Sequence, residues 1–150
     1  MILRTTIRLV NDISLVPIVR HIAVHPLREL GVIEEDIDRV AMIISEACSN
    51  VVKHAYTGAA DYTVGLKYQA GRLTIVVADH GRGFDYAGVK APVPGQVGGY
   101  GLSLIREYAD SFTVTSTIGQ GTRLVAEVSL VYRNAEYRDK AHELDGTASS

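Results

Sequence analysis

The feature that most constrains this chain is a long amphipathic pattern that runs from Glu34 to about Ala55. Three acidic residues stand at its start, where the positive end of a helix dipole favours them, and Thr57 with Gly58 ends it. Apolar residues between these ends recur every three or four positions, so they share one helix face. They are Ile37, Val40, Ala41, Ile44, Ala47, Cys48, Val51, Val52 and Ala55. A helix with one apolar face packs that face against another layer of structure.

The remaining segments are mostly strands. Alternation of polar and apolar residues, together with turn residues such as Ala70-Gly71, predicts the strands, while 3–4 spacing predicts two more helices. The expected strands are residues 2–10, 61–69, 72–79, 111–117 and 122–132, and the other helices are residues 15–30 and 102–110. Pro26 should kink or divide the first helix, and Gly31 should end it. Because helices and hairpins are segregated, we expect an α+β fold, a two-layer sandwich of helices on one face of a mainly antiparallel sheet.

The length of 150 residues indicates a single domain, which we place at residues 1–132, with a polar tail at 133–150 that is partly helical or frayed. A hydrophobic content of 47% and a charged content of 21% exclude a disordered chain or a rod. The net charge of −2 argues against a polybasic nucleic-acid binder. Cys48 is the only cysteine, so an intrachain disulfide is excluded, and its position on the apolar face indicates a small core residue.

The apolar segments of the sequence resemble neither a signal peptide nor a membrane span, and this predicts where the protein is located. Arginines interrupt the apolar stretch at the N-terminus, unlike the core of a signal peptide. The longest apolar runs are far shorter than the roughly 18–20 residues of a membrane span. We therefore expect a soluble cytoplasmic protein.

A first functional pattern lies on the long helix, in the run Ser-Glu-Ala-Cys-Ser-Asn. Glu46 and Asn50 are four residues apart, so they lie one turn apart on the same face. Their oxygens could both point at a divalent cation or a reacting hydroxyl, and Mg²⁺ commonly takes only one or two ligands from the protein. The alternative for an isolated pair of this kind is a solvated helix face.

A second pattern closes a buried strand. Asp79 is its last residue, and Gly81 and Gly83 follow within four positions. The carboxylate could accept a hydrogen bond from an exocyclic amine, and the glycines would let a flat ring approach the backbone. A tight turn, which Asp and Gly also favour, is the alternative.

The third pattern is a glycine-rich segment that leads into a helix. Residues 80–101 contain seven glycines and two prolines, which is too many for a regular element. The run Gly-Gly-Tyr-Gly at residues 98–101 places free backbone amides at a helix start, where phosphates bind well. It matches neither the phosphate loop nor the dinucleotide fingerprint. A flexible linker is the alternative.

In this order and within one small α+β domain, the three patterns resemble the GHKL ATPase superfamily of gyrase, heat-shock chaperones, sensor histidine kinases and mismatch-repair ATPases. Residues 46–55 are similar to its N box, residues 79–83 to its G1 box, residues 99–102 to its G2 box and residues 121–123 to its final Gly-Thr element. The resemblance covers residues 2–132. Within the superfamily, the spelling S-E-A-C-S-N-V-V-K-H-A-Y and the small size most resemble the bacterial anti-sigma-factor serine kinases.

The resemblance implies a mode of ATP binding. Asp79 would receive the adenine amine, Gly81 and Gly83 would lie beside the ring, and Thr122 would support Asp79 from the neighbouring strand. Residues 86–98 would form a lid over the phosphates.

The resemblance also implies roles at the phosphate end. Asn50 would coordinate Mg²⁺, and Gly99, Gly101 and the amide of Leu102 would hold the phosphates. Glu46 would act as the general base on a serine hydroxyl. Arg82, Lys90 and Arg106 are the cations near the γ-phosphate, and the choice among them stays open.

The implied activity is that of an ATP-dependent protein serine kinase. Its substrate would be an anti-anti-sigma protein of the STAS fold, and the chain would also sequester a sigma factor. Arg20, on the first helix, is either a partner contact or a solvated arginine, and the same helix and first strand could form a homodimer. No direct contact with nucleic acid or membrane is expected. The alternatives are a non-catalytic, ATP-binding regulator and an α+β domain that binds no nucleotide.

Overall fold

The computed structural model describes residues 2–54, 61–79, 100–117 and 121–144. They form a five-stranded sheet in the order β1-β2-β3-β5-β4, in which all neighbouring strands are antiparallel. The strands are β1 (Leu3–Val10), β2 (Asp61–Gln69), β3 (Arg72–Asp79), β4 (Ser111–Thr117) and β5 (Gly121–Ser129). The α+β expectation is confirmed, and so is the antiparallel sheet.

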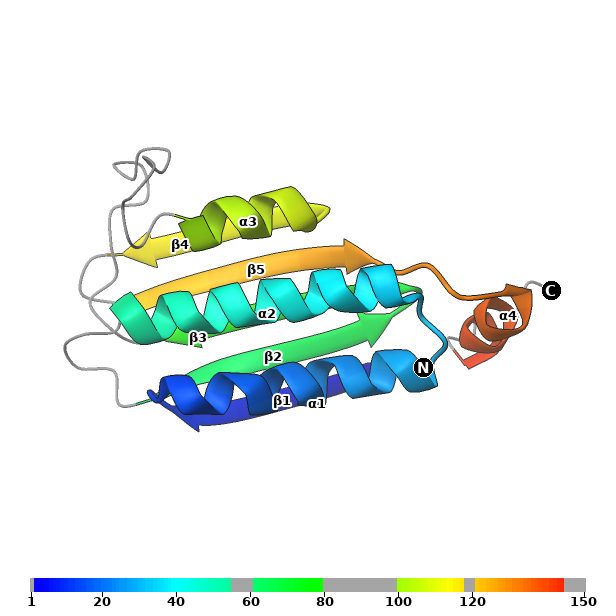
Figure 1. The fold of residues 1–150 in the computed structure, drawn as a ribbon, viewed down its shortest axis with the longest axis horizontal. Helices are drawn as coiled ribbons and strands as arrows, with labels where there is room; N and C mark the ends of the chain where they lie inside the picture. Colours follow the sequence, from blue (N-terminus) through cyan, green and yellow to red (C-terminus); the bar gives the residue numbers. More distant parts are fainter. Residues whose placement is uncertain (1, 55–60, 80–99, 118–120, 145–150) are drawn as a thin grey trace.

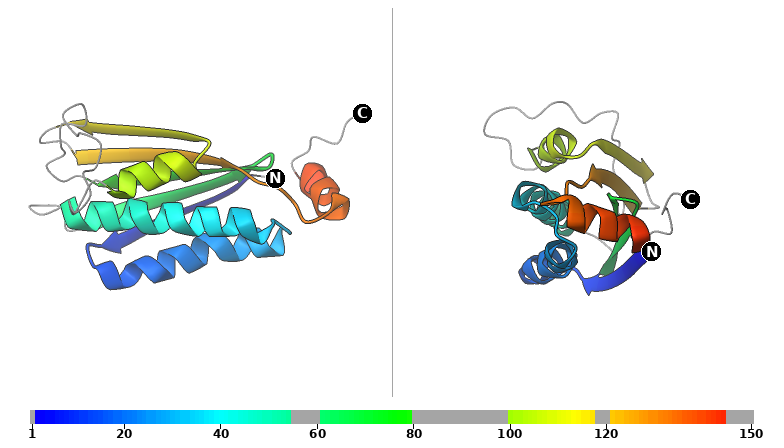
Figure 2. Two further views of the ribbon diagram at one scale, coloured as in Figure 1. Left: turned by 45° about the horizontal axis from the view of Figure 1, so that its top comes forward. Right: turned by 90° about the vertical axis from the view of Figure 1, so that its right-hand side faces the viewer.

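Three helices cover one face of this sheet: α1 (Val16–Glu29), α2 (Glu34–His54) and α3 (Tyr100–Tyr108). Figure 2 shows them on the same side of the strands. A short 3₁₀ helix, η1 (Ile13–Leu15), precedes α1, and Asp12 caps it by accepting a hydrogen bond from the Ser14 amide at 2.9 Å. None of the described helices combines the length and the apolar character needed to cross a membrane.

The core lies between the helices and the sheet because each strand alternates its side chains between two faces. On β2 every second residue from Tyr62 to Tyr68 is buried, and the residues between them are half-buried. The helices contribute fully buried residues to the same layer, such as Val19 of α1, Ile44 of α2 and Ile105 of α3. Cys48 is also fully buried, as its place on the apolar face predicts.

The connection between α1 and α2 turns at Gly31, which has a φ of +78°. A Cβ atom at this glycine would come within 2.2 Å of the Tyr137 ring, so only glycine fits both the backbone and the space. Pro26 lies inside α1, which continues past it to Glu29. The last strand ends at Ser129 rather than at residue 132, because its neighbour β3 begins only at Arg72, the register partner of Ser129; one more bond in the same register joins the Leu130 amide to the Gly71 carbonyl at 2.8 Å.

The polar C-terminal segment contains a helix, α4 (Ala135–Leu144), at the end of the molecule where α1 joins α2. Asn134 caps it by accepting a hydrogen bond from the Tyr137 amide at 3.1 Å. The Arg133 guanidinium stacks on the Tyr137 ring at 4.8 Å, and Ala141 is buried. Part of the predicted tail is therefore an ordered helix that packs against the connection at Gly31.

Candidate functional site

The ends of four secondary-structure elements meet at one end of the molecule. Helix α2 and strand β3 run toward this end, while α3 and β5 begin there (Figure 1). The fold therefore brings Asn50 of α2, Asp79 of β3 and Thr122 of β5 to the same end as the first residue of α3, Tyr100. These residues come from segments that lie up to 72 positions apart in the sequence.

Asp79 lies in the middle of a row of three cross-strand neighbours. Its register partners are Tyr62 on β2 and Thr122 on β5. All three are buried, Asp79 and Thr122 with 8% exposure each, so they share the face that the helices cover. Directly opposed residues have their Cβ atoms about 5 Å apart. An ionised carboxylate only accepts hydrogen bonds, so this row favours a ligand that donates an N–H or O–H group to Asp79.

Tyr62 is a residue of this site that the sequence analysis did not identify. It is 1% exposed, and its hydroxyl has no partner of normal hydrogen-bond geometry among the described residues. The Cys48 thiol of α2 interacts with this hydroxyl. Burial raises the pKa of Cys48 to about 12 and also raises the pKa of Tyr62, so both groups are neutral at physiological pH. Strand alternation puts Tyr62 on a buried face, but its pairing with Asp79 depends on a register that periodicity does not reveal.

Glu46 and Asn50 border the core on α2. Between them, Ala47 and Cys48 are fully buried, whereas Glu46 is half-buried and Asn50 is 8% exposed. Within the described part of the chain, neither side chain forms a hydrogen bond or an ion pair. The Asn50 amide is not among the fully buried side-chain groups that lack a partner, so it keeps access to solvent and is available to a ligand.

Arg20 connects α1 to the same part of α2. Its Nη1 donates to the Ser45 hydroxyl at 3.1 Å, one residue before Glu46, and the contact is partly buried. Arg20 is therefore neither a fully solvated arginine nor a side chain that projects freely from α1.

Helix α3 is held against α2 along its length. Leu102 and Ile105 are buried, with 8% and 0% exposure. At its C-terminal end the Tyr108 carbonyl accepts two hydrogen bonds from Arg39 of α2, from Nε at 3.0 Å and from Nη2 at 2.6 Å. Gly101 is the second residue of α3, so the start of this helix lies at the same end as Asn50.

Several residues predicted for this site lie outside the described ranges. They are Gly81, Arg82, Gly83, Lys90 and Gly99, together with the predicted lid at residues 86–98. The described residues that belong to the prediction are Glu46, Asn50, Asp79, Gly101, Leu102 and Thr122.

The donor set at this end fits a magnesium ion that shares its coordination with phosphates and water. In the described residues there is no group of three or more His, Cys, Asp or Glu side chains that could hold a metal alone. Asn50 offers one amide oxygen, and Mg²⁺ commonly uses only one or two protein ligands when a polyphosphate supplies others.

Comparison with known proteins supports the resemblance of the sequence patterns. A family model for the histidine kinase-like ATPase domain matches residues 9–127. Among curated proteins, a serine-protein kinase RsbW of Halalkalibacterium halodurans is 30% identical over 100 residues, which are 60% of this chain and 62% of that protein. A serine-protein kinase RsbW of Bacillus cereus is 37% identical over 65 residues, 43% of this chain and 41% of that protein. The matches therefore span less than two thirds of either relative.

The fold is also found among solved structures. The structure of the RsbU and RsbW domains of Rv1364c from Mycobacterium tuberculosis superposes with a TM-score of 0.66. The match covers 85% of this chain and 32% of that chain at 21% identity. At this identity the likeness concerns the fold.

Proposed function

Because this chain belongs to the histidine kinase-like ATPase domain family, we propose that it is an ATP-dependent protein serine kinase. The observation that most supports this proposal is the meeting of a buried carboxylate, a buried amide and a helix start at one end of the fold. These groups suit the adenine, the metal-bound phosphates and the phosphate chain of one nucleotide. The similarity to two serine-protein kinases supports transfer to serine rather than ATP binding alone.

At the adenine end, Asp79 accepts a hydrogen bond from the exocyclic amine. The neighbouring Thr122 supplies a hydroxyl on the adjacent strand, within reach of the same ring edge. Gly81 and Gly83, which follow Asp79 in the sequence, lie next to the ring.

At the phosphate end, the amides of Gly99, Gly101 and Leu102 bind the phosphate oxygens at the positive end of α3. Asn50 contributes its amide oxygen to Mg²⁺, and the ion neutralises charge on the phosphates when it is bound. The packing of α3 on α2 through the buried Leu102 and Ile105 holds the start of α3, with Gly101 and Leu102, against the helix that carries Asn50.

Glu46 is the group that accepts a proton in the transfer. It lies one helical turn before Asn50 and has no ion-pair partner among the described residues. The serine hydroxyl of the substrate gives its proton to the Glu46 carboxylate while its oxygen bonds to the γ-phosphorus. The bond between this phosphorus and the bridging oxygen breaks, and ADP is the leaving group.

For the substrate we propose an anti-anti-sigma protein of the STAS fold, and for the second partner a sigma factor that the chain sequesters, both in the cytoplasm. Arg20 and Ser45 form a polar contact between α1 and α2 beside Glu46, so a partner that binds α1 would lie next to the proposed transfer site.

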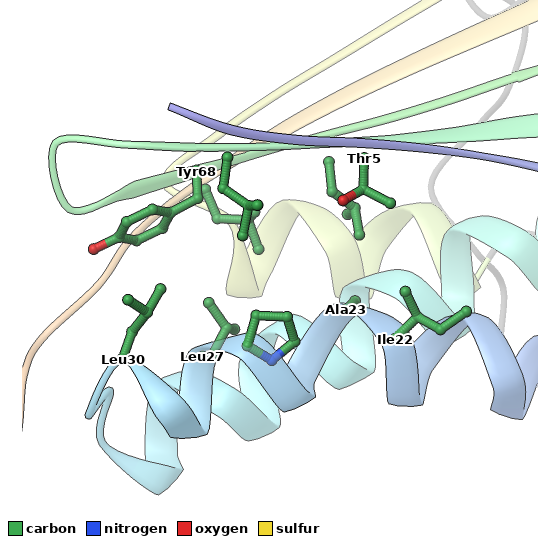
Figure 3. A pocket seen from close by; sticks show the side chains of 10 residues that line it. Thr5, Ile22, Ala23, Leu27, Leu30 and Tyr68 are labelled. Atoms are coloured by element: carbon green, nitrogen blue, oxygen red, sulfur yellow. The ribbon is translucent and has the colours of Figure 1, made fainter. Parts of the chain in front are cut away.

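We also propose that the chain forms a homodimer through β1 and α1. Strand β1 is an edge of the sheet, so one side of its backbone is unpaired. Leu3 and Ile22 are both 38% exposed and line an apolar pocket between β1 and α1, together with Leu27 and Tyr68 (Figure 3). A second copy that pairs with β1 would cover this pocket.

Phosphate transfer is tested by incubating the purified chain with labelled ATP, Mg²⁺ and a STAS-domain protein encoded beside it. The expected result is label on a serine of the STAS protein, identified by mass spectrometry. If the chain retains nucleotide but transfers no label, it is a non-catalytic regulator that ATP switches. If it retains no nucleotide, the adenine and phosphate assignments are both wrong.

A further inference from the structure

The face of the sheet away from α1, α2 and α3 has a charge that differs from that of the whole chain. Among the described residues no helix packs on it (Figure 2). Strand alternation and register place five basic and two acidic residues on this face, an excess of three positive charges. They are Arg4, Arg8, Lys67, Arg72 and Arg123, with Asp61 and Glu127. The chain as a whole has a net charge of −2.

Both acidic residues of this open face are already paired. Arg8 Nε lies 2.7 Å from Asp61 Oδ2, and Arg72 Nη1 lies 2.9 Å from Glu127 Oε2. Among the described residues, Arg4, Lys67 and Arg123 have no ion-pair partner. The excess positive charge therefore belongs to these three side chains.

The three cations stand at two ends of an uncharged groove. Arg4 and Lys67 are register partners on β1 and β2, and Arg123 lies two strands and four residues away on β5. Strand spacings of about 4.8 Å and rises of about 3.3 Å per residue put the two ends about 16 Å apart. The groove between them has a volume of about 450 Å³.

The floor of this groove consists of small side chains. Gly65 lies at its middle, flanked by Val76 and Ala78, and threonines 6, 63 and 74 surround them. A Cβ atom at Gly65 would lie 3.7 Å from its nearest neighbour, which is an ordinary contact distance. The hollow is therefore present because glycine has no side chain, and a Cβ atom would fit there without a clash. A helix can approach a floor of this kind closely, as helices approach sheets in layered folds.

We propose that the open face binds an acidic helical segment of a partner protein. Its carboxylates would lie about 16 Å apart, a distance that about 11 helical residues span, with small residues between them. Charge complementarity supports this occupant, because the groove presents positive charge at both ends and hydroxyl and methyl groups between them.

A single-stranded nucleic acid and a membrane surface fit the open face less well. Of the described aromatic residues in the sheet, Tyr62, Tyr68 and Phe112 are on the face that the helices cover, so the open face has no ring on which bases could stack. Of the apolar residues that line the groove, Leu66 belongs to the core under the helices, and Val76 and Ala78 are too short to enter a lipid layer.

The test measures binding of labelled helical peptides to the full chain without nucleotide, so its outcome is independent of ATP binding. One peptide of about 16 residues has glutamates near both ends, spaced by about 11 positions, and alanines between them. Its two counterparts have glutamine or lysine in place of the glutamates. We expect the glutamate peptide to bind about tenfold tighter than the glutamine peptide at low ionic strength, and less so when salt is added.

Substitutions test whether the preference for the glutamate peptide comes from the open face of the sheet. Arg4→Gln with Lys67→Gln and Arg123→Gln should remove it, whereas Arg28→Gln with Arg138→Gln and Lys140→Gln, which removes the same charge from exposed sites on α1 and α4, should keep it. The charge-reversed form, Arg4→Glu with Lys67→Glu and Arg123→Glu, should prefer the lysine peptide, a gain that misfolding would not produce.

The proposal is wrong if the glutamate and glutamine peptides bind with equal affinity. It is also wrong if the two triple variants lose the same amount of affinity for the glutamate peptide. It is also wrong if an oligo-dT strand or a vesicle containing phosphatidylglycerol binds the open face more tightly than the glutamate peptide does.

Discussion

At the scale of single residues, the buried row of Tyr62, Asp79 and Thr122 is the proposed site for the adenine end of a nucleotide. Tyr62 and Cys48 are neutral and buried beside this row, and Asp79 is the only carboxylate in it. Recognition of the base and transfer of the phosphate should therefore respond to different substitutions.

The first prediction concerns Asp79→Asn. The amide presents a donor where the carboxylate presents an acceptor, so a hydrogen bond of about 1.5–3 kcal/mol to the adenine amine is lost. We expect ATP affinity to fall by about 10- to 100-fold, as measured by isothermal titration calorimetry. Asp139→Asn, an exposed change on α4, is the control and should leave affinity unchanged. Wild-type affinity in Asp79→Asn would contradict an adenine site at this residue.

The second prediction concerns Glu46→Gln. Glutamine has nearly the same size but does not accept the serine proton, so transfer should slow by about 10²- to 10⁴-fold. The dissociation constant for ATP should stay near the wild-type value. Radiolabel transfer and calorimetry measure the two quantities separately. Glu35→Gln, an exposed change at the start of the same helix, is the matched control. Unchanged turnover in Glu46→Gln would remove this residue from the mechanism.

At the scale of elements, a polar network joins α2, α3 and β5 at the end opposite the proposed site. The Arg39 guanidinium contacts Asp36 at 3.0 Å, Asp110 at 3.5 Å and the Tyr108 carbonyl at the end of α3. Asp36 is 4% exposed and also accepts a hydrogen bond from the Val131 amide at 2.8 Å. Arg39 therefore ties the C-terminal end of α3 to α2 and to the end of β5.

The third prediction is that Arg39→Met destabilises the fold by about 2–4 kcal/mol, because the buried Asp36 loses its cation. Arg72→Met removes an exposed ion pair with Glu127 and should cost less than about 1 kcal/mol. Chemical denaturation of both variants gives the comparison. Equal losses would show that Arg39 contributes no more than a surface charge.

The fourth prediction concerns pH and Asp110. Its pKa is below the usual value of 3.8, chiefly because its carboxylate accepts the Ser129 amide, with a further contribution from Arg39. A lowered pKa in the folded state stabilises the fold above the unfolded pKa, and this stabilisation is lost as pH falls through the folded pKa. The difference in unfolding free energy between the wild type and Asp110→Asn should therefore be constant near neutral pH and shrink below about pH 4. A difference that grows toward acid pH would contradict this.

At the scale of the whole molecule, function is distributed over separate surfaces. The proposed nucleotide site lies at one end, α4 packs at the other, the β1 edge and α1 present exposed apolar residues, and the open sheet face is basic. Because these surfaces are separate, the proposed nucleotide, second copy and partner protein would each have a different part of the molecule to bind.

The fifth prediction concerns the homodimer. Leu3→Glu with Ile22→Glu places charges at the pocket between β1 and α1, and we expect a shift from dimer to monomer in analytical ultracentrifugation. Met42→Glu with Val131→Glu changes two exposed apolar residues outside β1 and α1, 37% and 55% exposed, and this control should remain a dimer. A wild-type chain that sediments as a monomer at all concentrations would rule out the dimer.

The strands, the helices and the faces they bury could be predicted from the sequence. Alternation marked β2 and β3, and 3–4 spacing marked α2, because the side chains that produce these patterns are neighbours along the chain. The same local patterns identified Glu46, Asn50 and Asp79 as candidates. The end of β5 was predicted three residues too far, since it is set by the start of its neighbour β3 at Arg72, a residue distant in the sequence.

By itself the sequence determined the α+β class, the apolar faces and the three motifs, because each depends on residues a few positions apart. Only the tertiary structure decided that Asp79 pairs with Tyr62 and Thr122, that Arg39 holds the end of α3, and that three cations share the open face. These relations depend on strand order and register, in which residues far apart in the chain become neighbours. A shift of one residue in that register would move every side chain of a strand to the other face of the sheet.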